Sequence, residues 1–194
     1  MLATSTSVGY CEAATAAVAI PRHPDDSFAQ AGQEAETMPL YEPELEFIAD
    51  MEAHVAMAVP IGPAAWGTRL ICPVVRGTVE GPKLKGVVRP FGADWALVRT
   101  DGCIELDVRL IVETVDGALI HVEYRGVIDL TRDEVDRLRS GRAVGDMKIH
   151  TAPRFETAHP EYVWLNRIQA IGCGSNEVVG EEIKVTYSWY ALKS

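Results

Sequence analysis

The sequence IELDVRLIVETVDGALIHVEYRGVI, residues 104–128, decides the fold, because apolar and polar side chains alternate along two runs within it. Alternation with a period of two is typical of β-strands that bury one face. Asp116-Gly117 separates the runs, and this pair favours the tight turns of β-hairpins, which need residues with positive φ. The segment therefore predicts two antiparallel neighbours, at 104–114 and 118–128, and argues against parallel strands joined by crossovers.

Turn signals continue along the chain, which contains 16 glycines and 11 prolines. Asp101-Gly102 is a second tight-turn pair, and residues 80–82 (Glu-Gly-Pro) and 90–93 (Pro-Phe-Gly-Ala) separate further runs of strand-forming residues. Residues 172–175, Gly-Cys-Gly-Ser, have no helix after them and are interpreted as a hairpin loop. The predicted strands are residues 45–59, 68–79, 83–89, 94–100, 104–114, 118–128, 148–156, 162–171 and 182–192.

Consecutive antiparallel strands favour an all-β, up-and-down β-barrel of about eight strands, because a closed sheet has no exposed edge. One segment departs from the strand pattern. Thr131 and Glu134 have the spacing of a capping box, and Gly141 follows as a residue that ends a helix. We therefore expect one short connecting helix, at about residues 131–140, that closes one end of the barrel.

Charge divides the chain into two parts. The net charge is −10, and residues 1–44 contribute −6 of it through seven acids and one arginine. Because this stretch has few large apolar side chains to offset the entropy of ordering, we expect a flexible acidic arm, residues 1–44, before a single barrel domain, residues 45–194. The chain has no basic patch, which argues against a nucleic-acid partner, and no apolar run long enough to predict a membrane span.

The four cysteines and five histidines lack the spacing of metal ligands. There is no Cys-x-x-Cys, His-x-His or His-x-x-x-His pair, so we expect neither a metal nor another cofactor. Widely separated cysteines indicate reduced thiols and a cytoplasmic protein, and two disulfides in a secreted protein are the alternative that counting leaves open.

The alternation leaves open which face of the strands carries chemistry. In one arrangement the aliphatic side chains of 104–114 face the barrel interior and the charged ones face water, and the sequence alone favours this arrangement. In the other, the charged side chains turn toward a ligand cavity, which Asp107 and Arg109 would line. Trp95 fits equally a plug of the barrel end or a clamp for a planar ligand, and Asp94 a local cap or a general acid or base.

A second group of polar and aromatic residues lies at 154–166. Alternation puts Arg154 and Glu156 on one face of a strand, where they fit a cross-strand ion pair or a ligand contact. Trp164 and Asn166 fit a stacking wall with an amide for a ligand carbonyl, or structural positions. The sequence alone slightly favours the structural interpretation.

Several short motifs occur in one order: EGPKLKG (80–86), GADW (92–95), LDVR (106–109), RFET (154–157) and YVWLN (162–166). This order resembles the domain of unknown function family 3237, also called uncharacterised protein family 0311, over residues 45–192. The resemblance implies an antiparallel barrel of about eight strands and an accessory role in small-molecule metabolism, including natural-product and aromatic-compound pathways. It also implies pocket roles for the residues at its signature positions, which are Asp94, Asp107, Arg109, Arg154, Glu156 and Asn166.

These observations favour a cofactor-independent enzyme, an isomerase, cyclase or hydro-lyase, that acts by general acid/base chemistry on a small, largely apolar carbonyl or cyclic metabolite in or at the mouth of the barrel. The expected catalytic residues are Asp94, Asp107 and Arg109. The expected substrate-binding residues are Trp95, Glu113, Arg154, Glu156, Trp164 and Asn166. The alternatives are a carrier or sensor that binds the metabolite without converting it, and an interaction scaffold that uses the acidic arm. Apolar positions on the outer face would favour a homo-oligomer in each case.

Overall fold

The computed structural model describes residues 40–139, 142 and 144–193, so most of the predicted acidic arm, residues 1–44, lies outside the described residues. The strands are β1 (Glu44–Ala56), β2 (Val59–Ala64), β3 (Gly67–Glu80), β4 (Gly86–Asp94), β5 (Leu97–Val98), β6 (Cys103–Thr114), β7 (Leu119–Asp129), β8 (Lys148–Glu156), β9 (Ala170–Val179) and β10 (Glu182–Lys193). The helices are α1 (Arg132–Arg139) and the 3-10 helix η2 (Pro160–Arg167). Within this described part of the chain, no helix is long and apolar enough to cross a membrane.

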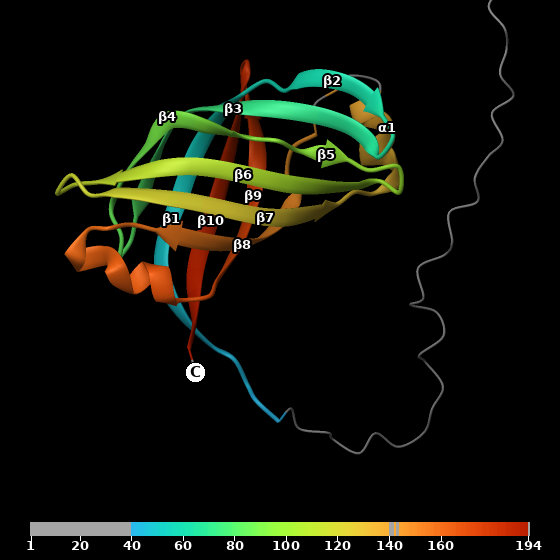
Figure 1. Ribbon diagram of the computed structural model, residues 1–194. Helices are drawn as coiled ribbons and strands as arrows, with labels where there is room; N and C mark the ends of the chain where they lie inside the picture. The colour runs from blue at the N-terminus through green and yellow to red at the C-terminus, as the bar shows by residue number, and fades with distance from the viewer. Residues whose placement is uncertain (1–39, 140–141, 143, 194) are drawn as a thin grey trace, which may run out of the picture. The chain divides into compact units, whose positions relative to one another are not determined.

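The sheet closes into a ring of eight strands. The hydrogen-bonded order is β1-β10-β9-β8-β7-β6-β4-β3, and antiparallel pairing between β1 and β3 completes the circle (Figure 1). Strand β2 pairs with β3 beside the ring, and β5 pairs with both β3 and β6. Nearly every strand therefore neighbours the next in sequence, and the predicted up-and-down antiparallel barrel of about eight strands is confirmed.

The β6–β7 hairpin and the helix α1 form where the sequence predicts them. Gly117 has a φ of +86°, and the Thr114 N–H donates a hydrogen bond to Ala118 O at 2.9 Å across the turn. At the start of α1, the Thr131 N–H donates to Glu134 Oε2 at 2.7 Å. This is the carboxylate half of the capping box, which satisfies a backbone donor that a helix start leaves unpaired.

Two predicted elements near the C-terminus are wrong. The segment predicted as a strand, 162–171, is the helix η2 followed by the start of β9. Pro160 lies at the first helical position, where its missing N–H costs no hydrogen bond. The predicted hairpin loop, 172–175, lies inside β9 and pairs with both β8 and β10. Gly174 is needed there because a Cβ would overlap the backbone oxygen of Thr186 on β10.

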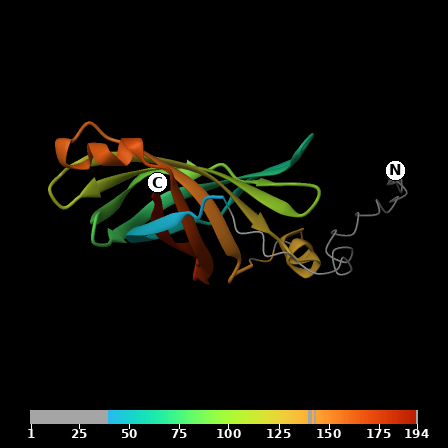
Figure 2. The same cartoon turned by 90° about the horizontal axis from the view of Figure 1, so that it is seen from below.

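Large side chains fill one end of the barrel. Trp189 and Ile48 are fully buried, and Phe155 meets Trp189 edge to face with ring centroids 5.4 Å apart. Leu165 of η2 is buried in the same core, so η2 seals this end. Figure 2 shows η2 (orange) and α1 (gold) at opposite ends of the barrel. The strands are packed solid near η2, and they leave a hollow toward α1.

Candidate functional site

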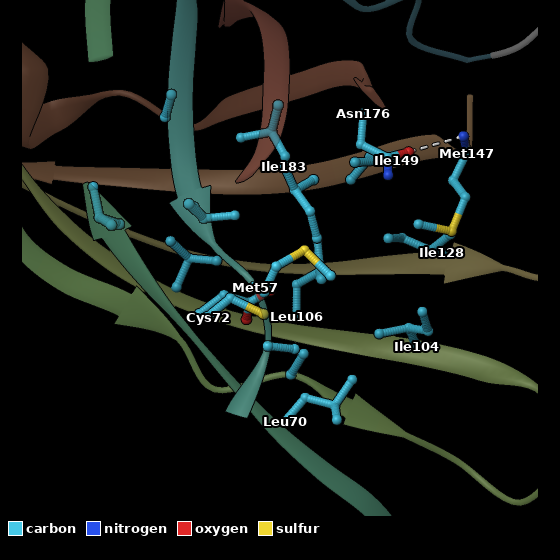
Figure 3. A pocket seen from close by; sticks show the side chains of 18 of the residues that line it. Met57, Leu70, Cys72, Ile104, Leu106, Ile128, Met147, Ile149, Asn176 and Ile183 are labelled. Atoms are coloured by element: carbon cyan, nitrogen blue, oxygen red, sulfur yellow. Dashed lines mark hydrogen bonds between the residues drawn. The ribbon is translucent and has the colours of Figure 1, made fainter. Parts of the chain in front are cut away.

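The hollow is a cavity of about 410 Å³ in the barrel interior. It is walled by the aliphatic faces of the strands, and on β6 the side chains of Ile104, Leu106 and Val108 point into it. Figure 3 shows Ile104 and Leu106 directed at the same space as Ile149 of β8 and Ile183 of β10. A volume of a few hundred Å³ with apolar walls is typical of a small-molecule site.

Strand β6 directs its charged side chains to the outer face, because neighbouring residues in a strand point to opposite sides. Arg109 Nη1 lies 2.8 Å from Asp107 Oδ1, and Arg125 Nη2 lies 3.3 Å from Asp107 Oδ2. The Arg109 guanidinium also lies over the ring of Trp95, 5.6 Å from its centroid. Three predicted site residues, Asp107, Arg109 and Trp95, thus come together on the surface and are not among the cavity-lining residues.

Asp94 is the predicted catalytic residue that lines the cavity. Residues 90–93, predicted as a turn, lie within β4 as an irregularity: Arg89 pairs with Ile111 of β6, but Gly92 already pairs with Leu110. Gly92 has a φ of +121°, which side-chain-bearing residues rarely adopt. The extra residues bring Asp94 opposite the inward-facing Val108 at the end of β4. A bulge of this kind re-aims a side chain, here a carboxylate into an apolar space.

The Asp94 carboxylate bridges a gap in the sheet and carries a perturbed pKa. Its Oδ1 accepts a hydrogen bond from the Asp107 N–H at 3.0 Å, where β4 has ended and β5 has not begun. Burial raises the pKa of Asp94 to about 6, with a further increase from the charge of Asp107. The hydrogen bond from the Asp107 N–H and the charge of Arg69 act in the opposite direction. A carboxyl group that titrates near neutral pH suits proton transfer.

Two tyrosines and one thiol line the cavity with Asp94. Tyr124 of β7 and Tyr187 of β10 are buried and meet edge to face, with ring centroids 5.7 Å apart. Burial raises the pKa of both hydroxyls, and the charge of Asp94 adds to this in each case. Burial and, to a smaller extent, the negative charge of Asp94 raise the pKa of the Cys72 thiol to about 12. These two hydroxyls and the thiol are therefore electrostatically coupled to one carboxylate in a largely aliphatic cavity.

Known proteins resemble this chain over nearly the whole barrel. Residues 43–192 match the sequence profile of the family described as "Protein of unknown function (DUF3237)". The chain belongs to this family. Among its relatives, a UPF0311 protein from Rhodopseudomonas palustris is 35% identical over 131 residues, which are 66% of this chain and 86% of that protein.

Solved structures agree with the fold of this DUF3237 chain. A crystal structure of a protein with unknown function from Clostridium acetobutylicum aligns with a TM-score of 0.71 at 29% identity, over 78% of this chain and 100% of that chain. A beta-barrel like protein from Acinetobacter baumannii aligns with a TM-score of 0.62 at 31% identity, over 80% of this chain and 100% of that chain. The family resemblance found in the sequence motifs is confirmed.

Other predicted binding residues of this DUF3237 barrel lie in ion pairs on the outer face. Glu113 Oε2 is 2.8 Å from Arg89 Nη1, and Arg154 Nη1 is 3.9 Å from Glu123 Oε1. The side chain of Glu156 is 84% exposed. None of these residues lines the cavity. Their alternation with buried neighbours follows the pleat of β6 and β8.

Trp164 and Asn166 lie on η2, at the sealed end of the barrel. Trp164 is partly buried against the core, with Lys83 Nζ 5.5 Å from its ring centroid. Asn166 Oδ1 accepts from the Thr157 N–H at 2.9 Å, and its Nδ2 donates to Thr157 O at 2.8 Å. Asn166 therefore fastens η2 to the end of β8 and does not line the cavity.

Sequence reasoning missed four polar residues that line the cavity: Tyr124, Arg142, Asn176 and Tyr187. Tyr124 has a visible signal, because it continues the aliphatic face of β7 with a hydroxyl among buried residues. Asn176 has none, because the sequence predicts a loop at 172–175 and no strand between residues 171 and 182. Among the residues that the structure describes, no three His, Cys, Asp or Glu side chains come together as a metal site, and Cys72, Cys103 and Cys173 are free thiols.

Proposed function

We propose that this protein is a cofactor-independent enzyme, an isomerase, cyclase or hydro-lyase, that binds a small, largely apolar carbonyl or cyclic metabolite in the barrel cavity. The observation that carries the proposal is the Asp94 carboxyl group, whose pKa is raised to about 6 inside a largely apolar cavity that Tyr124 and Tyr187 also line. Near neutral pH this group is present both as the carboxylate and as the carboxylic acid, so it can take a proton and return it.

The simplest chemistry available to these groups is enolisation. The Asp94 carboxylate removes a proton from a carbon next to the ligand carbonyl. The electron pair of that C–H bond forms a C=C bond to the carbonyl carbon, and the π pair of the C=O bond moves to the oxygen. A hydroxyl of Tyr124 or Tyr187 donates a hydrogen bond to this oxygen as its negative charge develops. The Asp94 carboxylic acid then returns the proton to the same carbon or, where the ligand has a C=C bond conjugated with the enolate, to the far end of that bond, so atoms and charge balance. An isomerisation, or the first half of an elimination or ring closure, needs no more than this.

The α-hydrogens of a model ketone test the proposal although the natural substrate is unknown. In D₂O, the protein is expected to catalyse exchange of the α-hydrogens of 2-tetralone, followed by proton NMR. Asp94→Asn should lower the exchange rate about 100-fold or more, within the range typical of general acid/base catalysis. Asp50→Asn, which changes an exposed carboxylate on β1, is the matched control and should exchange at the wild-type rate.

One observation favours a carrier instead. Asp94 Oδ1 already accepts the Asp107 N–H, so the carboxylate has a structural role without any ligand. A carrier would bind 2-tetralone, detected by displacement of the fluorescent ketone prodan, and would not exchange its α-hydrogens. Binding with no exchange above the background rate would therefore support the carrier and overturn the enzyme.

A further inference from the structure

Asn176 is a buried amide on β9 that reaches across to a segment with no regular structure. It is 4% exposed and lines the cavity. Its partners lie at residues 144–147, which follow α1 and precede β8. Backbone groups in such a segment need partners from elsewhere, because they have no ladder or helix to pair with.

Three hydrogen bonds attach this segment to Asn176. The Asn176 Nδ2 donates to Val144 O at 2.9 Å, and the Met147 N–H donates to Asn176 Oδ1 at 3.0 Å. The Asp146 N–H donates to the backbone oxygen of Asn176 at 2.8 Å. Asp146 has a φ of +59°, so the chain turns sharply between the two side-chain contacts. Figure 3 shows the bond from Met147 to Asn176 beside the cavity.

The residues held in this way form part of the cavity wall. Val144 is 4% exposed, and both Val144 and Met147 line the cavity. Ile149, two residues after Met147, lines the cavity from the start of β8. Two of the three hydrogen bonds that hold this wall therefore come from one side-chain amide, whose oxygen and nitrogen are both used.

We infer that Asn176 is a positioning residue that holds Val144 and Met147 as the wall which limits the size of ligand the cavity admits. The inference rests on the proposed function only in taking the cavity as the ligand site, and not on catalysis there. Loss of the amide removes the bonds to Val144 O and from the Met147 N–H, leaves the backbone bond from Asp146, and so lets Val144 and Met147 move outward. Large ligands then gain room, and small ligands lose contacts on that side.

Two uncharged ketones of different size test this inference. Prodan is the larger probe and reports its own binding by fluorescence, and 2-tetralone is the smaller probe and is measured by displacement of prodan. Asn176→Ala should shift the ratio of the two dissociation constants about tenfold in favour of prodan, as expected when a pocket loses its fit to a small ligand. Thr157→Val is the matched control. It removes a buried hydroxyl that donates to Leu119 O at 2.8 Å and accepts the His159 N–H at 3.2 Å, and it lies outside the cavity lining, so the ratio should stay unchanged.

A ratio that stays the same in Asn176→Ala, or that shifts equally in Thr157→Val, overturns the inference, as does failure of both probes to bind the wild-type protein. If Asn176→Ala does not fold, hydrogen exchange at the Met147 amide of the wild-type protein decides, and exchange as fast as in an unfolded chain overturns the inference. A shifted ratio together with absent α-hydrogen exchange would sustain the inference and remove the proposed enzyme.

Discussion

Replacing Asp94 with asparagine is expected to change how the free energy of unfolding depends on pH. Burial raises the pKa of Asp94 from 3.8 to about 6. Between these values the folded protein holds a proton that the unfolded chain has released. Asparagine has nearly the same shape and does not titrate, and its Oδ1 can still accept the Asp107 N–H, which lies 3.0 Å from Asp94 Oδ1. The substitution therefore removes the titration and keeps the contact.

The proton stabilises the folded state, so Asp94 makes the protein less stable as the pH rises from 3.8 to about 6. One pKa unit corresponds to about 1.4 kcal/mol, and the rise of about two units is therefore worth about 3 kcal/mol over the whole range. Part of this range lies below pH 4.5. Between about pH 4.5 and about pH 7.5, the wild-type protein should lose about 2 kcal/mol relative to Asp94→Asn.

Urea unfolding followed by tryptophan fluorescence measures this difference, with both proteins unfolded at the same series of pH values. Asp116→Asn is a control with the opposite sign, because the hydrogen bond from the Thr114 hydroxyl lowers the pKa of Asp116. The stabilisation from Asp116 is lost only as the pH falls below 3.8, so its difference from wild type should be constant over the same window. A constant difference for Asp94→Asn as well would refute the reasoning, because the folded protein would then hold no extra proton at Asp94.

Two further changes test the packing of the two ends. Burial raises the pKa of Cys72 to about 12, whereas Cys173 is exposed. Because the thiolate is the reactive form, iodoacetamide at mildly alkaline pH should alkylate Cys173 well before Cys72. Peptide mapping by mass spectrometry reads the order, and faster reaction of Cys72 would show that the cavity is more open and polar than described. Trp189 is fully buried at the sealed end, so Trp189→Ala should lower the free energy of unfolding by about 3–5 kcal/mol. A loss below about 1 kcal/mol in urea unfolding would contradict the dense packing there.

The barrel was predictable from sequence because its signals are local. The alternation in 104–128 and the Asp116-Gly117 turn depend on neighbouring residues alone, and the structure places both as expected. The helix η2 was not predictable in the same way, because Tyr162-Val163-Trp164-Leu165 is a run of aromatic, β-branched and aliphatic residues of the kind that strands favour. Contacts far along the chain decide that segment, above all the burial of Leu165 against the sealed end.

The residues of the candidate site were harder to predict than η2, because their positions depend on contacts between strands that are distant in sequence. Asp94 lines the cavity because an irregularity in β4 shifts its pairing with β6, and no local pattern gives the size of a bulge. Asp107 and Arg109 belong to another of the family's signature motifs. Because β6 alternates regularly there, their side chains lie on the outer face. Conversely, Asn176 and Tyr187 are single polar residues whose neighbours come from other strands, so their place in the cavity emerges only when the ring closes.

Whether the barrel interior is packed or hollow does not follow from the alternation of apolar and polar residues along the strands. Both need an aliphatic inner face, and the difference lies in side-chain volume. Near η2 the interior receives Trp189, Phe155 and Leu165, which fill it. Toward α1 the lining is mostly Ala, Val, Leu and Ile beside two tyrosines, and Ala53 and Ala96 are positions where a small side chain leaves room. Larger aliphatic residues at those positions would bury more apolar surface and pack more densely, as protein interiors generally do. A cavity kept at the cost of that packing, with its titratable carboxylate inside, is what a ligand site requires and what stability alone would remove.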